Sequence, residues 1–391
     1  MKQFEKWLPG RTAILHMAIL LYTLEQCWIS TRILPHNDVL SEGVKAISAL
    51  LLVLTILRQD FTPRLYLIYG LAALGAATIR LRTGFMADVF TLLMILAIRQ
   101  DDLTPIIRII RRTITAFLVV HLCCYLYLLC TGRLTLFAVD PVGRVRADLG
   151  MVHPNTAGSF FLSLVMAWAW EKYDSFRPIQ LVYILILGTG VYLLTDSRTT
   201  YACVIALCAL LLSARYSERA AKLMNGVAGW ITPAIGIFLL VCSLLWDWQG
   251  PILKIDSLLS GRIHLSRRGI VEFGFTLFGQ KVQYGAIPEG AVWNTWVSAF
   301  TFDCAYSYLW SNIGILWLVL ICFCFYRLSR LRNPRISLFL ILWALYSVTE
   351  TLSMISVRFF PLLLISVLFL PKDEAHRLYG PKAAASQQMQ A

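Results

Sequence analysis

Residues 178–214 read PIQLVYILILGTGVYLLTDSRTTYACVIALCALLLSA, and this stretch decides the fold class. It holds two apolar runs, 178–195 and 197–214, with a short polar turn between them. Each run is close to the ~20 residues with which a helix crosses the hydrocarbon core of a bilayer. The stretch therefore predicts two membrane-crossing helices joined by a tight turn.

The whole chain has the same character. Of its 391 residues, 58% are hydrophobic and 15% are charged, whereas about 25% are charged in an ordinary soluble domain. The net charge is +13, but no separate basic domain is predicted that would bind nucleic acid. We therefore expect an all-α, polytopic integral membrane protein with residues 1–391 as a single membrane domain.

Hydropathy along the chain predicts about twelve transmembrane helices. Several have only about 15 residues, which is short for a spanning helix, so they either extend into their flanks or are buried within the bundle. The predicted helices are 11–34, 44–57, 64–80, 84–99, 113–131, 155–171, 178–195, 197–214, 229–247, 305–326, 335–353 and 357–370.

The distribution of Lys and Arg predicts which side each connection faces. An even number of spans puts both termini on one side, and cytoplasmic connections are enriched in Lys and Arg. With both termini cytoplasmic, the inner connections are short and carry most of these residues. The outer face then carries two long connections, 132–155 and 248–304, and long connections in a compact chain usually carry function.

Four ionisable residues within the predicted spans lie toward the outer end: Glu25, Asp88, Arg198 and Glu350. Such residues are costly in a membrane and are functional candidates by default. The alternative for each is a structural ion pair. His121, midway along its span, is expected to be a packed and hydrogen-bonded histidine.

Several kinds of chemistry have no motif in this sequence. There is no GxxxxGK phosphate loop, no Asp-x-Asp pair and no HExxH. Most of the ten cysteines lie inside apolar runs and are expected to behave as small hydrophobes. We therefore expect no nucleotide, metal or other cofactor, and a substrate that carries its own leaving group, such as a lipid diphosphate in the outer leaflet.

Two polar strings flank predicted helix starts at the outer face. In LGMVHPNTAGSFF (149–161), Pro154 disfavours helix at His153, and Asn155 or Thr156 is expected to cap the helix that follows. In TDSRTTY (195–201), Arg198 begins a helix, and its planar fork of donors suits diphosphate oxygens. The alternatives are an ordinary loop and cap for the first, and an ion pair of Arg198 with Glu25, Asp88 or Glu350 for the second.

The long outer connection supplies two further strings. In SGRIHLSRRGIVEFG (260–274), Ser260 is a candidate N-cap of an interfacial helix that places Arg262, Arg267 and Arg268 near phosphate level. Nonspecific binding of anionic headgroups is the alternative. The string LFGQKVQYG then predicts turns at its glycines. In TFDCAYSYLWSNIGI (301–315), Asp303 precedes a span, where a lone acid usually pairs with the helix dipole.

Taken together and in this order, the strings resemble the O-antigen ligase and Wzy-type polysaccharide polymerase superfamily. The resemblance covers about residues 145–320, whereas the first four spans match in hydropathy alone. The matching strings are HPNTAG (153–158), SRTT (197–200), SGR (260–262), LFG (277–279) and DCAYSYLWSNIGI (303–315).

The resemblance implies a GT-C-like membrane glycosyltransferase that needs neither metal nor nucleotide. It would polymerise undecaprenyl-diphosphate-linked oligosaccharide repeat units on the outer face of the plasma (inner) membrane, in O-antigen, capsule or exopolysaccharide biosynthesis. The donor and the acceptor would both be lipid-diphosphate-linked oligosaccharides among membrane lipids. A flippase and a chain-length regulator would be its protein partners.

The resemblance also assigns roles. Its two arginines map to Arg198 and Arg262. We expect these two to bind the diphosphate, together with Arg267 and Arg268, which the sequence itself places near phosphate level. Asp303, or less favourably His153, would take the proton of the acceptor hydroxyl. Ligase members carry a histidine where this chain has Asp303, which favours a polymerase over a ligase. The expected substrate-binding residues are Asn155, Ser197, Thr199, Tyr306 and Trp293.

Two other functions stay open. One is an O-antigen-type ligase. The other is a lipid-linked oligosaccharide flippase or another transporter, which would also have a dozen spans and cationic sites. Transporter sites lie near the midplane of the bilayer, whereas the ionisable residues here are predicted to gather at one leaflet.

Overall fold

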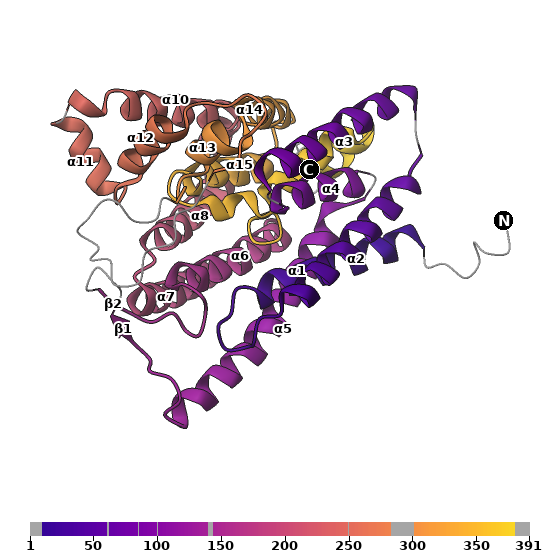
Figure 1. Cartoon of the computed structure of the whole chain (residues 1–391). Coiled ribbons are helices and arrows are strands. Elements are labelled where there is room, and N and C mark those ends of the chain that lie inside the picture. Colours follow the sequence, from indigo (N-terminus) through magenta and orange to yellow (C-terminus); the bar gives the residue numbers. More distant parts are fainter. Residues whose placement is uncertain are drawn as a thin grey trace, which may run out of the picture.

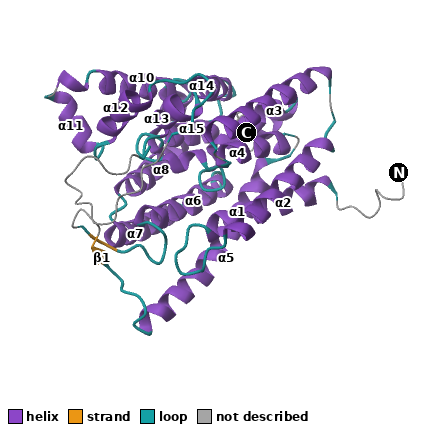
Figure 2. Cartoon of the chain, in the orientation of Figure 1, coloured by secondary structure: helices purple, strands orange, loops and turns teal. Residues whose placement is uncertain are grey.

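The computed structural model describes residues 10–60, 62–84, 86–99, 101–139, 144–248, 250–282 and 301–379. The expected all-α class is confirmed (Figure 2). The described part also contains one antiparallel pair of two-residue strands, β1 (Ala138–Val139) and β2 (Val145–Arg146), in the predicted outer connection 132–155.

The helices follow one another along the chain as Figure 1 shows. They are α1 (Arg11–Trp28), α2 (Asp38–Leu57), α3 (Pro63–Thr83), α4 (Ala87–Ile98), α5 (Leu103–Cys130), α6 (Pro154–Lys172), α7 (Pro178–Thr195), α8 (Arg198–Tyr216), α9 (Glu218–Val227), α10 (Ile231–Leu244), α11 (Pro251–Leu258), α12 (Arg262–Phe273), α13 (Ala305–Tyr308), α14 (Ile315–Ser329), α15 (Pro334–Tyr346) and α16 (Lys372–Tyr379). A π-helical turn spans Leu309–Ile313, and 3-10 helices span Trp246–Trp248, Thr351–Met354 and Phe360–Phe369.

Fewer helices than expected are long enough to cross a bilayer. Five described helices are both long and apolar, and the bent pair α9 and α10, with 56° between its halves, makes a sixth if it counts as one span. These helices indicate a multi-pass membrane protein, but they do not make twelve spans. The remaining apolar helices α4, α14, α15 and Phe360–Phe369 have between 10 and 17 residues.

Burial explains why some helices are short. Nearly every residue of α15 and of Phe360–Phe369 is buried, so these elements form the centre of the bundle. By contrast, α3 and α7 expose leucines over most of their length, such as Leu74 and Leu187. Irregular backbone at membrane depth is tolerated where protein surrounds it, and this accounts for a 3-10 helix of ten residues at the centre.

The connections gather at two opposite ends of the bundle. At one end, Arg11 forms an ion pair with Asp101 (2.8 Å), and the hydroxyl of Tyr379 donates to Asp102 (3.0 Å). At the other end, Arg32 pairs with Asp148 (2.7 Å). The segments predicted to be inner therefore meet one another, and so do the segments predicted to be outer.

His121 of α5 holds the connection that precedes α6. Its Nδ1 lies 3.1 Å from the hydroxyl of Thr31, and its Nε2 lies 2.8 Å from the carbonyl oxygen of Leu149. The expectation of a packed, hydrogen-bonded histidine is thus confirmed. These bonds fix the segment that leads to His153.

The predicted single helix 305–326 is wrong, because the chain breaks at Gly314. This glycine has φ +122°, and its N–H donates to the carbonyl oxygen of Leu309. The segment 276–280 lies against the break: Thr276 N–H donates to Trp310 O (3.1 Å) and Thr276 O accepts from Ile315 N–H (2.8 Å). The backbone of one connection therefore satisfies groups that the broken helix leaves without partners.

Other boundaries also differ from the sequence-based expectation. The first helix ends at Trp28 and not at 34, α5 begins at Leu103, ten residues before the expected start, and α15 ends at Tyr346. The predicted helix 357–370 is a 3-10 helix, and α9 and α11 were not predicted. Hydropathy marks apolar segments, but packing around the central helices decides where the regular α conformation stops.

We expect Gly314→Ala to destabilise the protein strongly. An added Cβ would overlap the carbonyl oxygen of Leu277, and the φ of +122° suits glycine. Backbone strain of this kind costs about 1–3 kcal/mol, so the melting temperature of the detergent-extracted protein should fall by several degrees. Gly190→Ala in α7 is the matched control, because nothing lies within 4 Å of its Cβ position. Equal melting temperatures for the two variants would contradict the tight contact at Gly314.

Candidate functional site

The starts of α6, α8 and α13 meet the turn after α15 at one end of the bundle. Asn155 of α6 donates its side-chain N–H to Glu350 Oε1 (3.0 Å). Thr349 donates its hydroxyl to that of Thr199 in α8 (2.8 Å). Ala305 N–H of α13 donates to Ser347 O (2.9 Å). The turn 347–350 therefore joins three of the strings that the sequence singled out.

Arg262 and Asp303 form the ion pair of this site. The guanidinium Nη2 lies 3.2 Å from Asp303 Oδ2, and Nη1 donates to Ser260 O (2.9 Å). The side chain of Arg262 is 17% exposed and that of Asp303 is 37% exposed. Arg262 Nε is buried and has no hydrogen-bond partner among the described residues. The pair thus contains one buried guanidinium N–H without a partner among the described residues.

Asp256 of α11 positions Arg262 by capping the start of α12. Its Oδ1 accepts from the N–H groups of Ile263 (2.8 Å) and His264 (3.1 Å). The expected N-cap Ser260 is wrong: the N-cap is Gly261, with φ +82° and no capping side chain. The helix start is therefore held by an acid seven residues upstream of Ile263, a distance in sequence that the usual capping patterns do not cover.

Arg198 pairs within its own turn. Its side chain is 67% exposed and forms an ion pair with Asp196, two residues earlier (3.1 Å). The acids that the sequence offered as partners are bound elsewhere: Tyr308 donates to Asp88 (2.8 Å). The alternative of an ion pair with Glu25, Asp88 or Glu350 is therefore wrong, and the turn itself supplies the partner.

His153 is itself the N-cap of α6. Its Nδ1 accepts from Asn155 N–H (3.1 Å), and its side chain is exposed. The expectation that Asn155 or Thr156 would cap this helix is wrong, because His153 takes that role and leaves the Asn155 side chain to reach Glu350. Ser197 is buried, and a Cβ on Gly158 would lie 2.6 Å from its hydroxyl, so α6 and α8 approach closely here.

The other expected site residues have different positions. Arg267 pairs with Asp247 (3.3 Å), and Arg268 pairs with Glu272 one turn later. Tyr306 is fully buried and donates to Ala344 O (3.2 Å), so it lies in the core and away from any sugar at the surface. Trp293 lies outside the described residues.

Glu350 belongs to this site, although the sequence gave it no specific role there. It follows α15, outside the long apolar helices, and burial raises its pKa to about 8. The charge of Arg262 lowers this pKa, the charge of Asp303 raises it, and the hydrogen bond from Asn155 lowers it. The sequence signal was an acid near the outer end of a span, but its partners come from distant parts of the chain.

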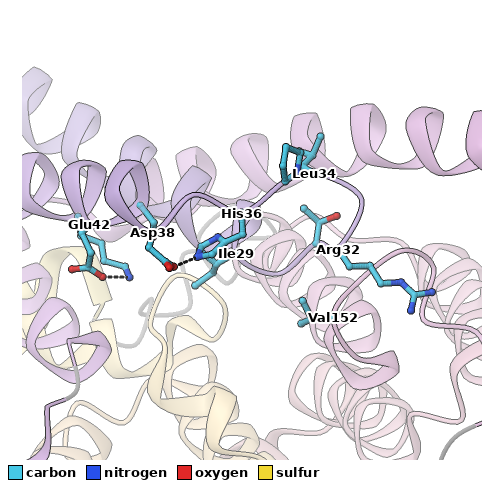
Figure 3. Close-up of a pocket in the computed structure, with 11 residues that line it drawn as sticks. Ile29, Arg32, Leu34, His36, Asp38, Glu42 and Val152 are labelled. Atoms are coloured by element: carbon cyan, nitrogen blue, oxygen red, sulfur yellow. Dashed lines mark hydrogen bonds and ion pairs between the residues drawn. The ribbon is translucent and has the colours of Figure 1, made fainter.

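A cleft of about 520 Å³ lies beside the start of α2 (Figure 3). Val152, the residue before His153, is one of its lining residues. Its charged side chains are already paired, in the contacts Arg32–Asp148 (2.7 Å), His36–Asp38 (2.8 Å) and Lys45–Glu42 (2.9 Å). A diphosphate would have to break these pairs. Its apolar wall consists of Ile29, Leu34, Pro35 and Val152.

Comparisons with models of known protein families, with curated proteins and with solved structures found no match. Among the described residues, no three His, Cys, Asp or Glu side chains lie close enough together to hold a metal ion.

We expect Asp256→Ala to loosen the start of α12. Loss of a helix cap costs about 0.5–2 kcal/mol, so amide hydrogen exchange at residues 262–266 should become faster by roughly 2- to 30-fold. Asp247→Ala is the control, because it removes an exposed ion pair with Arg267 in the same helix but no cap. If both variants change the exchange equally, Asp256 does not hold the helix start.

Proposed function

We propose that this protein is a membrane-embedded glycosyltransferase that polymerises lipid-diphosphate-linked oligosaccharide repeat units. The observation that carries the proposal is the ion pair of Arg262 and Asp303, in which one buried guanidinium N–H has no partner among the described residues. A cation with a spare donor beside a carboxylate fits a reaction in which a diphosphate leaves and a hydroxyl is deprotonated. The resemblance of the strings around these residues to polysaccharide polymerases supports the same class.

In the proposed reaction, the hydroxyl oxygen of the acceptor attacks the anomeric carbon of the donor sugar. The bond between that carbon and the phosphate oxygen breaks, and the lipid diphosphate leaves with the bonding electrons. Arg262 binds the diphosphate and stabilises the charge that develops on it, which is usually the largest contribution in such transfers. Asp303 accepts the proton of the acceptor hydroxyl, as a general base does.

Binding of the donor would also prepare Asp303 for this role. While Arg262 lies 3.2 Å from it, the carboxylate is engaged in the ion pair. A diphosphate competes for the same guanidinium and releases the carboxylate. Arg198, exposed and paired with Asp196, lies where an approaching anion can displace that partner. We assign Arg198 to recruitment of the donor and Arg262 to the reaction.

The proposal includes the orientation and span number expected from the sequence. Both termini are placed in the cytoplasm of the plasma membrane, with the site at the outer face, because Lys and Arg concentrate in the connections at the opposite end. The short central helices would complete the twelve crossings by lying inside a ring of longer ones. A polymerase is preferred to a ligase because position 303 is an aspartate.

The function is tested with full-length protein in membranes that are supplied with extracted lipid-diphosphate-linked repeat units. Wild type should produce a ladder of glycan lengths on gels. Arg262→Lys keeps the charge but loses the planar fork, so we expect at least about a tenfold loss of rate, and Asp303→Asn should lose roughly 10²- to 10⁴-fold.

Arg219→Lys in α9 is the control for the arginine, because this exposed residue lies at the opposite end of the bundle. Its ladder should match wild type. Wild-type ladders from both Arg262→Lys and Asp303→Asn would remove the ion pair from the reaction. Transport of the lipid-linked unit without any ladder would instead support the transporter.

The orientation is tested by labelling cysteines in intact cells, in a background without the native cysteines. Val152→Cys, at an exposed position of the predicted outer end, should react with a membrane-impermeant maleimide. Glu218→Cys, whose position is 83% exposed at the predicted inner end, should react after permeabilisation and not before. The reverse pattern would place the site on the cytoplasmic side.

A further inference from the structure

The turn 347–350 lies outside the strings that resemble the polymerase family, but it contacts the elements that carry three of them. It binds α6 through Glu350, α8 through Thr349 and α13 through Ser347. The hydroxyl of Ser347 also donates to that of Ser353 (2.8 Å), which fastens the turn to the following 3-10 helix. The turn is therefore fixed on both sides, and its single acid faces the Arg262–Asp303 pair.

We infer that Glu350 is a positioning residue of this site, which acts as a neutral acid that holds Asn155 and leaves the charge of Arg262 to Asp303 and to the donor diphosphate. This inference rests on the proposed function and adds a condition to it. With Glu350 neutral, one cation faces one carboxylate. With Glu350 ionised, two carboxylates would surround one guanidinium, and the excess negative charge would repel a diphosphate.

The charged and titratable groups around Glu350 come from several helices. Arg262 of α12 and Asp303 before α13 carry charge, whereas the side chains of Asn155 in α6, Cys203 in α8 and Tyr346 in α15 are uncharged at neutral pH. Asp303 thus opposes a negative charge on Glu350, and Arg262 favours it. The guanidinium of Arg262, however, is already paired with Asp303.

The pKa of about 8 fits this role. A carboxyl group with that pKa is about 90% neutral at pH 7 and about 90% ionised at pH 9. Because the folded-state pKa lies above the ordinary value of a glutamate, the group stabilises the fold at low pH and loses this contribution as the pH rises through 8. Both the reaction and the stability should therefore weaken between pH 7 and pH 9.

The test compares wild type, Glu350→Gln and Glu350→Ala as full-length proteins. Gln is neutral at every pH and retains an oxygen that accepts from Asn155. We expect polymerisation by wild type to fall about tenfold between pH 7 and pH 9 and that by Glu350→Gln to stay nearly level. At pH 7, Glu350→Gln should retain at least half of the wild-type rate, whereas Glu350→Ala should lose about tenfold.

A second readout needs no enzymatic activity. From pH 7 to pH 9 the unfolding equilibrium constant of wild type should rise about tenfold more than that of Glu350→Gln, seen as a larger fall in the melting temperature of the purified protein. Glu171→Gln is the control: Glu171 is ion-paired with Arg111 at the other end (2.7 Å), and an ordinary carboxyl stays ionised across this range. Its pH dependence should match wild type.

These outcomes separate the two proposals. If wild type makes no polymer at any pH, the proposed function fails, and the melting curves still decide whether Glu350 holds its proton near neutral pH. If wild type is active but Glu350→Gln shows the same alkaline loss in rate and the same melting curve, the inference is wrong. It is also wrong if Glu350→Gln is as inactive as Glu350→Ala at pH 7, because the carboxylate charge is then required.

Discussion

The rest of the site depends on how the chain satisfies its backbone at Gly314. A broken helix in the interior of a membrane protein leaves N–H and C=O groups that water cannot reach. Here the segment 276–280 supplies the partners, and the side chain of Gln280 also donates to Phe273 O (2.9 Å), at the end of α12. The same contacts that repair the break therefore fix the C-terminal end of α12. With Asp256 capping its other end, α12 has little freedom, and Arg262 is held beside Asp303.

Electrostatics distinguishes Arg262 from Arg198 as a partner for the proposed diphosphate. Exposed ion pairs contribute little, about 0–1 kcal/mol, so the pairing of Arg198 with Asp196 is easily exchanged but provides little discrimination. Arg262 is 17% exposed, and its interactions are stronger because less water screens them. In the cleft beside α2, each of these cationic side chains already has an acidic partner: Arg32 pairs with Asp148, and His36 and Lys45 pair with acids of the cleft itself. Of these positions, Arg262 would therefore stabilise the proposed diphosphate most.

The sequence predicted the elements better than their contacts. Apolar runs located helices such as α7 with the correct ends, because in that part of the chain a polar turn and a proline mark both boundaries. They failed at Gly314 and after Tyr346, where the backbone follows tertiary partners. The hydroxyl of Thr91, for example, donates to Met354 O, 263 residues away in the sequence. In the site, the resemblance named both Arg262 and Asp303, and their assignment to one function stays a prediction. Their ion pair and the cap that Asp256 provides depend on distances in space that the sequence does not give. The sequence showed Glu350 as an acid near the end of a span, but it did not show that Asn155 binds it.

Helix lengths explain why the polar residues collect where they do. At 1.5 Å per residue, the 13 residues of α15 extend about 20 Å, whereas the 28 residues of α5 extend about 42 Å. The central helix α15 is thus shorter than the ~30 Å hydrocarbon core, and α5 is longer. Because α15 begins among the connections of one end, its last turn stops well short of the level that α5 reaches at the other. The turn 347–350 consequently follows a short central helix, and it contacts the starts of α6, α8 and α13. In the proposed reaction, a lipid diphosphate that reaches this turn would lose water, and a preorganised cation such as Arg262 would compensate for that loss.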